Sequence, residues 1–369
     1  MLHLASEVNG VVMQLAKSSV SFLINILMFP LHFVQLFSGA KSFEKNALLG
    51  SRFLNRHNLH IIRVKLAMRM ASMRRRRLRS LVPDHLVDAY EQDGFVCVEN
   101  FLDEEHFQNL LHDIDQTDFD RVDMYQGATT TRRSMIDDVD LETRPAVHAA
   151  RENESMLNLV RYVASHAGQP LVTLQTVLAK ASGDQDPQSD LHSDTFHATA
   201  KAWLFLNDVE EDDGPFCYVR GSHKMTKERL AWEKSISTSI DSVENKYSRR
   251  GSMRVSPKEL ADLGYPQPTK MVVKANTLVV ANTQGFHARC ASSKNTTRIE
   301  IYASLRRNPF LPFVAAPIAG FHLAALPLVK ARVNRLVIAA QAKIGELGIK
   351  PSPWNAIGYG KPKEWRHPD

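Results

Sequence analysis

The middle of the chain is dominated by short apolar segments in which buried and exposed positions alternate. The segments are separated by turns rich in Gly, Pro, Asp and Ser, and they cover residues 171–180, 199–207, 216–219, 271–274, 277–281 and 298–305. With a further strand after Gly94, they indicate about eight β-segments, a spacing typical of a sandwich or jelly-roll barrel. A polar helical insertion is predicted over residues 223–265.

Helical periodicity flanks this β-region on its N-terminal side. Apolar residues recur every three to four positions over residues 83–93, 103–112 and 156–167, which predicts three amphipathic helices. Residues 114–150 are polar and without period, and we expect a loop-rich region over a site. The predicted fold class is therefore mainly β with flanking helices: a double-stranded β-helix (jelly-roll, cupin-like) barrel with an N-terminal helical extension.

The first 80 residues differ from the rest of the chain in both hydropathy and charge. Residues 11–37 are strongly apolar, and no fully ionised side chain occurs between Ser18 and Ala40. A segment of this length can cross a bilayer as a helix. Pro30 and several polar residues equally allow a kinked segment lying in the membrane interface, or a helix folded onto the globular body.

Basic residues follow this apolar segment directly. Residues 1–80 hold 13 Lys and Arg, among them the run Arg74–Arg77, but only 2 acidic residues. The remaining 289 residues hold 33 Lys and Arg and 38 acidic residues. Such a cluster is attracted to anionic lipid and would keep the following domain in the cytoplasm. A nucleic acid partner is disfavoured because aromatic residues for base stacking are lacking; a merely solvated run of charge is the other alternative.

The cysteines indicate the cellular compartment, and the changes in composition along the chain indicate its domain organisation. Cys97, Cys217 and Cys290 lie far apart and indicate free thiols in a reducing compartment. We therefore expect a cytoplasmic protein attached to the inner face of a membrane through residues 11–79. The predicted parts are the extension (1–80), the barrel domain (81–310) and a C-terminal region (311–369). That last region holds a basic amphipathic helix between residues 317 and 342, which packs on the barrel or faces the membrane, and a tail expected to loop over the body.

A His-x-Asp pair, His192 and Asp194, is the first candidate for chemistry. On a strand both side chains point to one face, because the side-chain period is two. His287 ends a distant apolar segment and supplies a third ligand. Two imidazoles and one carboxylate leave open positions on a metal and suit Fe(II), Mn or Zn.

Arg298 narrows the choice of chemistry. It follows His287 by 11 residues, at the start of the next strand. An Arg at this place can pair in bidentate fashion with a dicarboxylate whose other end chelates the metal, as a 2-oxoglutarate co-substrate requires. By strand parity, Lys201 and Thr199 share the face of Trp203. Lys180 and Gln175, on the preceding strand, are further candidates for binding the co-substrate.

These elements together resemble the phytanoyl-CoA dioxygenase family of Fe(II)/2-oxoglutarate oxygenases. The resemblance rests on His192-x-Asp194, Trp203, the turn Asp213-Gly214-Pro215 leading to Gly221-Ser222-His223, and His287 with Asn295 and Arg298. It implies that His192, Asp194 and His287 bind Fe(II), that Arg298 binds the distal carboxylate of 2-oxoglutarate and that Trp203 lines its pocket. O2 is the second co-substrate, and ascorbate is an optional reductant. Gly221–His223 is implied to be a structural turn.

The resulting hypothesis is a dioxygenase that hydroxylates an aliphatic C–H bond of a small-molecule, lipid or lipid-linked substrate. Asp194 argues against a halogenase, which needs that metal position open for chloride. One alternative is a membrane-tethered, non-catalytic binding module on the same barrel; another is a soluble small-molecule hydroxylase whose N-terminal helices dock on the barrel. His197 is expected to be a core histidine, while the role of Arg289 and the identity of the substrate stay open.

Overall fold

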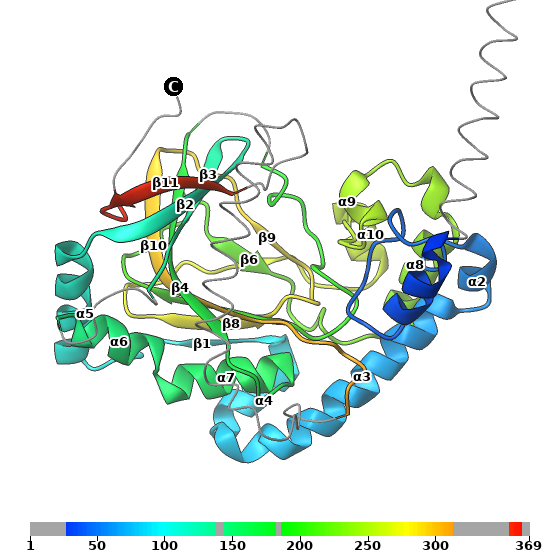
Figure 1. Cartoon of the computed structure of the whole chain (residues 1–369), viewed down its shortest axis with the longest axis horizontal. Helices are drawn as coiled ribbons and strands as arrows, with labels where there is room; N and C mark the ends of the chain where they lie inside the picture. The colour runs from blue at the N-terminus through cyan, green and yellow to red at the C-terminus, as the bar shows by residue number, and fades with distance from the viewer. Residues whose placement is uncertain (1–26, 137–142, 182–185, 313–353, 364–369) are drawn as a thin grey trace, which may run out of the picture.

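Two antiparallel sheets form the body of the molecule in this computed structural model, which describes residues 27–136, 143–181, 186–312 and 354–363 (Figure 1). The larger sheet has eight strands in the order β1-β8-β5-β10-β4-β3-β2-β11, and the smaller has the order β7-β6-β9. The strands are β1 (Phe95–Val98), β2 (Phe119–Gln126), β3 (Thr129–Ser134), β4 (Leu171–Ala179), β5 (Ala200–Phe205), β6 (Phe216–Tyr218), β7 (Thr269–Lys270), β8 (Leu278–Asn282), β9 (His287–Arg289), β10 (Thr296–Leu305) and β11 (Asn355–Gly360). The predicted β-barrel class with flanking helices is confirmed.

The helices lie outside the sheets. They are α2 (Arg52–Arg56), α3 (Leu59–Leu78), α4 (Asp84–Asp93), α5 (Glu104–Gln116), α6 (Pro145–Arg151), α7 (Glu154–Ala164), α8 (Lys227–Thr238), α9 (Lys246–Arg249) and α10 (Pro257–Asp262). Local signals set several of their ends. Asp103 caps α5 by accepting a hydrogen bond from the His106 N–H, and Gly94 ends α4 in the left-handed region at φ 86°.

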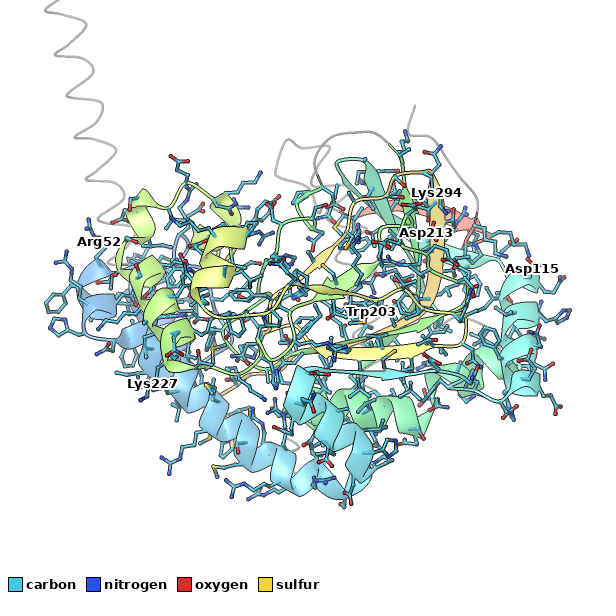
Figure 2. The ribbon with its side chains drawn as sticks, turned by 180° about the vertical axis from the view of Figure 1, so that it is seen from behind. Arg52, Asp115, Trp203, Asp213, Lys227 and Lys294 are labelled. Atoms are coloured by element: carbon cyan, nitrogen blue, oxygen red, sulfur yellow. The ribbon has the colours of Figure 1, made fainter. Side chains whose placement is uncertain are left out.

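The period-two pattern of the central strands divides the core into two parts. Ala202 and Leu204 of β5 face the helices and pack in the large cluster that includes Leu157 and Val160 of α7. Their neighbours Trp203 and Phe205 point the other way, into an aromatic cluster with Phe216, Tyr218 and Tyr302 between the two sheets. Figure 2 shows Trp203 in the middle of the barrel. The space between the sheets is therefore where a site can form.

The prediction of a loop-rich region over residues 114–150 is wrong. This stretch contains β2, β3 and α6, and β3 pairs with β4 along its whole length. These strands lack a clear apolar alternation because most of their buried positions are polar or charged. Arg132 is fully buried and forms two hydrogen bonds of 2.9 and 3.0 Å with the carboxylate of Asp123. A buried ion pair of this kind removes the hydrophobic alternation by which a strand is recognised.

The tail also differs from the expected loop. Its residues 355–360 form β11, which pairs with β2 at the edge of the large sheet. The guanidinium group of Arg121 holds the strand by donating to the backbone carbonyls of Gly358, Tyr359 and Lys361. The amphipathic helix predicted between residues 317 and 342 lies outside the described residues.

The described part of the N-terminal extension is packed against the barrel domain. On α3, the buried Arg63 donates to the carbonyls of Leu36, Ser38 and Ala40. His60 lies 2.8 Å from the buried Glu233 of α8, which also binds Arg229 at 2.9 Å. Residues 11–26 of the predicted apolar segment lie outside the described residues. Within the described ranges, no helix combines the length and the apolar character needed to cross a membrane.

Arg74 is the strongest link between the extension and the barrel domain. Its side chain is 3% exposed, and it donates to the carbonyls of Ser165, Pro309 and Leu311. Burial lowers the pKa of Arg74 to about 10, which leaves it charged at neutral pH. One cation thus ties together α3, the end of α7 and the segment after β10.

We predict that Arg74→Met lowers the free energy of unfolding by about 2–4 kcal/mol, because three backbone carbonyls, two of them in buried hydrogen bonds, lose their partner. Arg77 lies on the exposed side of the same helix, and Arg77→Met should change stability by less than about 0.5 kcal/mol. Urea denaturation of the two variants measures the difference. Equal stability of the two variants would show that α3 is not docked through Arg74.

Candidate metal centre

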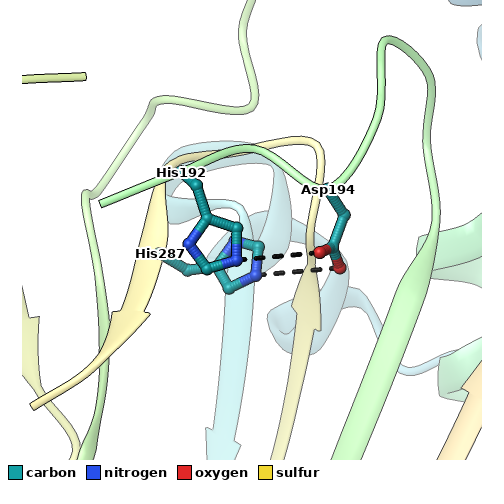
Figure 3. A group of neighbouring side chains, drawn as sticks. All are labelled: His192, Asp194 and His287. Atoms are coloured by element: carbon teal, nitrogen blue, oxygen red, sulfur yellow. Dashed lines mark ion pairs between the residues drawn. The ribbon is translucent and has the colours of Figure 1, made fainter. Parts of the chain in front are cut away.

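Three predicted residues meet between the two sheets. His192 and Asp194 lie in the segment that joins β4 to β5, and His287 begins β9 (Figure 3). The strand predicted through His192 and Asp194 is reduced to two isolated antiparallel bridges of His192, one to Arg254 and the other to His287. In the bridge to His287, His192 N–H donates to the His287 carbonyl at 3.0 Å, and His287 N–H donates back at 2.9 Å. Asp194 N–H donates to the Thr283 carbonyl at 2.8 Å, which holds the third residue beside the bridge.

The side chains converge within metal-binding distance. One nitrogen of each histidine and one oxygen of Asp194 all lie within 4.8 Å of one another. His192 Nε2 is 3.8 Å from Asp194 Oδ1, and His287 Nε2 is 3.7 Å from Asp194 Oδ2. Figure 3 shows both imidazoles directed at the carboxylate. The prediction that these three residues come together is met by this geometry.

Hydrogen bonds to the backbone select the ring nitrogen available for a metal. His192 Nδ1 lies 2.7 Å from the Asp190 carbonyl, and His287 Nδ1 lies 2.9 Å from the Gly285 carbonyl. A carbonyl only accepts, so in each ring Nδ1 carries the proton and Nε2 keeps its lone pair. Such partners orient metal-binding histidines in general. Both rings therefore offer Nε2 toward Asp194.

The electrostatics keep all three groups in the protonation states that a metal requires. Burial lowers the pKa of His287 to about 4 and that of His192 well below its usual value, so both imidazoles are neutral at pH 7. Burial alone would raise the pKa of Asp194, but Lys201 and the two histidines outweigh it and hold that pKa well below its ordinary range. A neutral pair of imidazoles and an ionised carboxylate form a complete set of ligands.

One unpaired atom supports the presence of a metal. His287 Nε2 is buried and has no hydrogen-bond partner among the described residues, although buried polar atoms are normally paired. A divalent cation between the three side chains would satisfy this nitrogen. The donor set of two nitrogens and one carboxylate, without thiolate, fits Fe(II) and leaves positions open for further ligands.

A cleft of about 170 Å³ opens onto this centre, and its lining includes three of the four residues predicted to bind a co-substrate. Arg298, Trp203 and Gln175 line it, together with Lys201. Lys180 does not line it, and this prediction is corrected. Lys180 is exposed just beyond the end of β4 and lies five positions from Gln175, so alternation along the strand places the two on opposite faces. Thr199 is buried against Thr283 instead of lining the cleft.

Arg298 is held in place by groups at its side. Its Nε lies 3.0 Å from Glu300, and one terminal nitrogen donates to the Gly214 carbonyl at 2.8 Å. Glu300 is fully buried and also accepts a hydrogen bond from Gln175. The buried carboxylate thus fixes both predicted residues, one on each of two paired strands.

Arg133 and Lys41 were not predicted to belong to the site, whereas Lys201 and Arg289 were named without a contact. Arg133 stacks 3.6 Å above the Tyr302 ring, and Arg289 forms a 3.0 Å ion pair with Asp186. Lys201 Nζ lies 2.7 Å from Asp194 Oδ2. The N-terminal extension contributes as well, because Lys41 Nζ donates to the Asp194 backbone carbonyl. Strand parity had marked Lys201, but no local signal in the sequence marks Lys41, which lies 153 positions from its partner.

The fold and site define a jelly-roll domain with a His-Asp-His centre, and the family model agrees. Residues 90–256 match the model described as phytanoyl-CoA dioxygenase (PhyH). The predicted resemblance to the phytanoyl-CoA dioxygenase family is therefore confirmed over residues 90–256. The curated proteins include no match.

Two solved structures are among those similar to this chain. HygX from Streptomyces hygroscopicus, with nickel and 2-oxoglutarate bound, is 15% identical, with a TM-score of 0.41 over 60% of this chain and 86% of HygX. The non-haem α-ketoglutarate-dependent epimerase SnoN from nogalamycin biosynthesis is 20% identical, with a TM-score of 0.40 over 61% of this chain and 82% of SnoN. The nickel, the 2-oxoglutarate and the epimerase reaction belong to those proteins.

We predict that the protein binds one divalent ion and that His287→Ala weakens this binding by more than about a hundredfold. Loss of an outer partner of a ligand already costs about 10–100-fold, and loss of the ligand itself costs more. Titration calorimetry with Co(II), a stable substitute for Fe(II), measures the affinity. His106→Ala removes an exposed histidine of α5 and serves as the control. Unchanged binding in folded His287→Ala would contradict the assignment.

Proposed function

We propose that the protein is an Fe(II)/2-oxoglutarate-dependent dioxygenase that hydroxylates an aliphatic C–H bond of a small molecule. The observation that carries this proposal is the pair of Nε2 atoms and the carboxylate converging at the end of a cationic cleft. Fe(II) with 2-oxoglutarate, when bound, supplies the activation of O2 and the oxidation of the substrate. The other residues of the site would orient the co-substrate, exclude water or neutralise charge.

The cleft residues divide into two groups by the part of 2-oxoglutarate they would meet. Arg298, at the side of the cleft, would pair with the distal carboxylate, since Glu300 and the Gly214 carbonyl already fix the direction of its guanidinium group. Trp203 and Phe216 stack with ring centroids 4.5 Å apart and would exclude water from the carbon chain. Gln175, bonded to Glu300, lies close enough to contribute to the same pocket.

Lys201 would reduce the negative charge around the metal. Burial lowers the pKa of Lys201, but the adjacent Asp194 carboxylate outweighs this effect and raises the net pKa, so the ammonium group persists. It can share Asp194 with the metal and so limit the coordination of that carboxylate to one oxygen. Because Asp194 occupies the third position, a halide has no place there, which favours hydroxylation as the outcome.

Three of the four cations that line the cleft have an acidic partner among the described residues, and one does not. Besides Arg298 and Lys201, the cleft is lined by Arg133 and Arg289. Arg289 is neutralised by Asp186, whereas Arg133 has no ion pair among the described residues and bonds only to the Thr173 hydroxyl at 3.0 Å. Arg133 therefore favours a substrate that carries an anionic group.

We predict that Arg298→Leu raises the KM for 2-oxoglutarate by about a hundredfold or more, the consequence of losing a charge-assisted bidentate contact worth about 3 kcal/mol. The rate of succinate formation at varied 2-oxoglutarate concentration, in the presence of Fe(II), measures this KM. Arg220→Leu removes an exposed arginine that pairs with Asp93 away from the cleft and is the matched control.

Failure of the wild-type protein to form succinate, with or without added small-molecule candidates, would favour the non-catalytic binding module. An equal effect of Arg298→Leu and Arg220→Leu on KM would contradict the placement of the distal carboxylate at Arg298.

We further propose that the protein attaches to an anionic membrane surface through its N-terminal extension. Six large apolar side chains within residues 27–37 are 47–80% exposed: Leu27, Phe29, Leu31, Phe33, Val34 and Phe37. Exposed basic residues follow on α2 and α3, among them Arg52, Arg56, Lys65 and Arg69. Exposed apolar residues combined with Lys and Arg suit the boundary between lipid headgroups and acyl chains. Such attachment would bring a lipid or lipid-linked substrate to the enzyme.

Sedimentation with phosphatidylcholine vesicles that contain phosphatidylglycerol tests the attachment. The double variant Phe29→Ser, Phe33→Ser should bind at least about tenfold more weakly, since each aromatic side chain contributes about 1.5–3 kcal/mol when buried in an apolar phase. Val272→Ser, an equally exposed apolar residue near β7, should bind as the wild type does. Equal binding by all three proteins, or none, would rule out this surface.

A further inference from the structure

A second cavity of about 640 Å³ lies between α3 and the turn that precedes α8. One face of α3 supplies Met68, Ala71, Ser72, Arg75 and Arg76, Arg79 follows directly after this helix, and the opposite wall includes residues 223–226. The cavity shares no lining residue with the metal cleft. In Figure 2, Lys227, the first residue of α8, marks the place where that helix starts beside α3. The cavity is thus a separate compartment, built in part by the N-terminal extension.

The walls of this cavity carry more positive than negative charge. Arg76 and Lys224 are exposed and have no acidic partner among the described residues. Arg75 lies 4.9 Å over the Tyr90 ring and otherwise donates only a long hydrogen bond of 3.4 Å to the Val163 carbonyl. Glu91, the acidic residue in the lining, already accepts a hydrogen bond from Tyr162 at 3.1 Å. Arg79 is neutralised by Asp84 at 2.7 Å.

His223 adds an independent sign of a ligand. Its side chain is 9% exposed and lines the cavity, and neither ring nitrogen makes a well-formed hydrogen bond among the described residues, although the Glu91 backbone lies close. Burial, with Arg75 and Lys224 nearby, lowers the pKa of His223 to about 3, so the ring is neutral and offers one donor and one acceptor. The neighbouring Ser222 explains the structural turn, since its hydroxyl accepts the Phe286 N–H at 2.8 Å. The His223 ring packs against Tyr90, with ring centroids 5.4 Å apart, but its two nitrogens have no comparable partner among the described residues.

We propose that this cavity binds a small organic anion. Its charged group pairs with Arg76 and Lys224, a polar group of the ligand bonds to His223, and its apolar body contacts Met68 and Met225. Gln284 lines the cavity and donates to the Phe196 carbonyl at 3.0 Å, two residues beyond Asp194.

Fluorescence titration of the full-length protein with anilinonaphthalene sulfonate, an aromatic anion, tests the proposal. Arg76→Gln combined with Lys224→Gln should weaken saturable binding by at least about tenfold, through the loss of two charge contacts. Arg77→Gln combined with Lys227→Gln changes the charge equally on the same two helical regions, outside the cavity, and should leave the affinity unchanged. Ser72→Trp fills the cavity without changing charge and should also abolish this binding.

Equal affinity in both double variants would overturn the proposal, and so would unimpaired binding by a folded Ser72→Trp variant. A third result would also overturn the proposal. In that case the Arg76→Gln, Lys224→Gln variant binds phosphatidylglycerol vesicles more weakly than the wild type, but its affinity for the sulfonate is unchanged. The two residues would then belong to a membrane surface. None of these measurements needs Fe(II) or 2-oxoglutarate, so their outcome is independent of the proposed reaction.

Discussion

The bridge between His192 and His287 is the constraint on which the centre depends. Two reciprocal backbone hydrogen bonds place these residues opposite each other, which sets their imidazole centroids 4.5 Å apart. A second pair of backbone carbonyls, from Asp190 and Gly285, then fixes the tautomer of each ring. Backbone geometry alone thus prepares two nitrogen ligands before any metal binds. Asp194, attached to the same segment through the Thr283 carbonyl, completes the set.

Buried charge holds the surrounding structure in place. Glu300 fixes Arg298 and Gln175 beside the cleft, Asp123 fixes Arg132 within the sheet, and Glu233 joins α3 to α8. Breaking one partner of such a pair is costly because the other charge stays buried, which favours a unique arrangement of the strands. The extension belongs to this network through Arg63, Arg74 and Lys41, so it supports the catalytic domain as well as carrying the exposed apolar residues proposed for membrane attachment.

The metal ligands could be predicted from the sequence because His192 and Asp194 are adjacent in a short motif, and because this motif together with His287 and Arg298 resembles a known family. The three ligands meet at one centre, and Arg298, Trp203 and Gln175 line the cleft that opens onto it. Lys180 does not line the cleft, since it lies beyond the end of β4. The strands β2 and β3 were missed because the buried pair of Asp123 and Arg132 looks like a polar loop in sequence. Lys41 could not be found at all, since its contact with Asp194 depends on the packing of an extension that precedes the domain.

Anaerobic titration of 2-oxoglutarate into the protein, with and without Fe(II), tests the central claim most directly. The account predicts that 2-oxoglutarate binds in a one-to-one ratio when Fe(II) is present, because the metal and Arg298 each hold one end of the molecule. Without the metal, or in the His287→Ala variant, the affinity should fall sharply. Equal affinity with and without Fe(II), or no binding to folded, metal-loaded protein, would contradict the account.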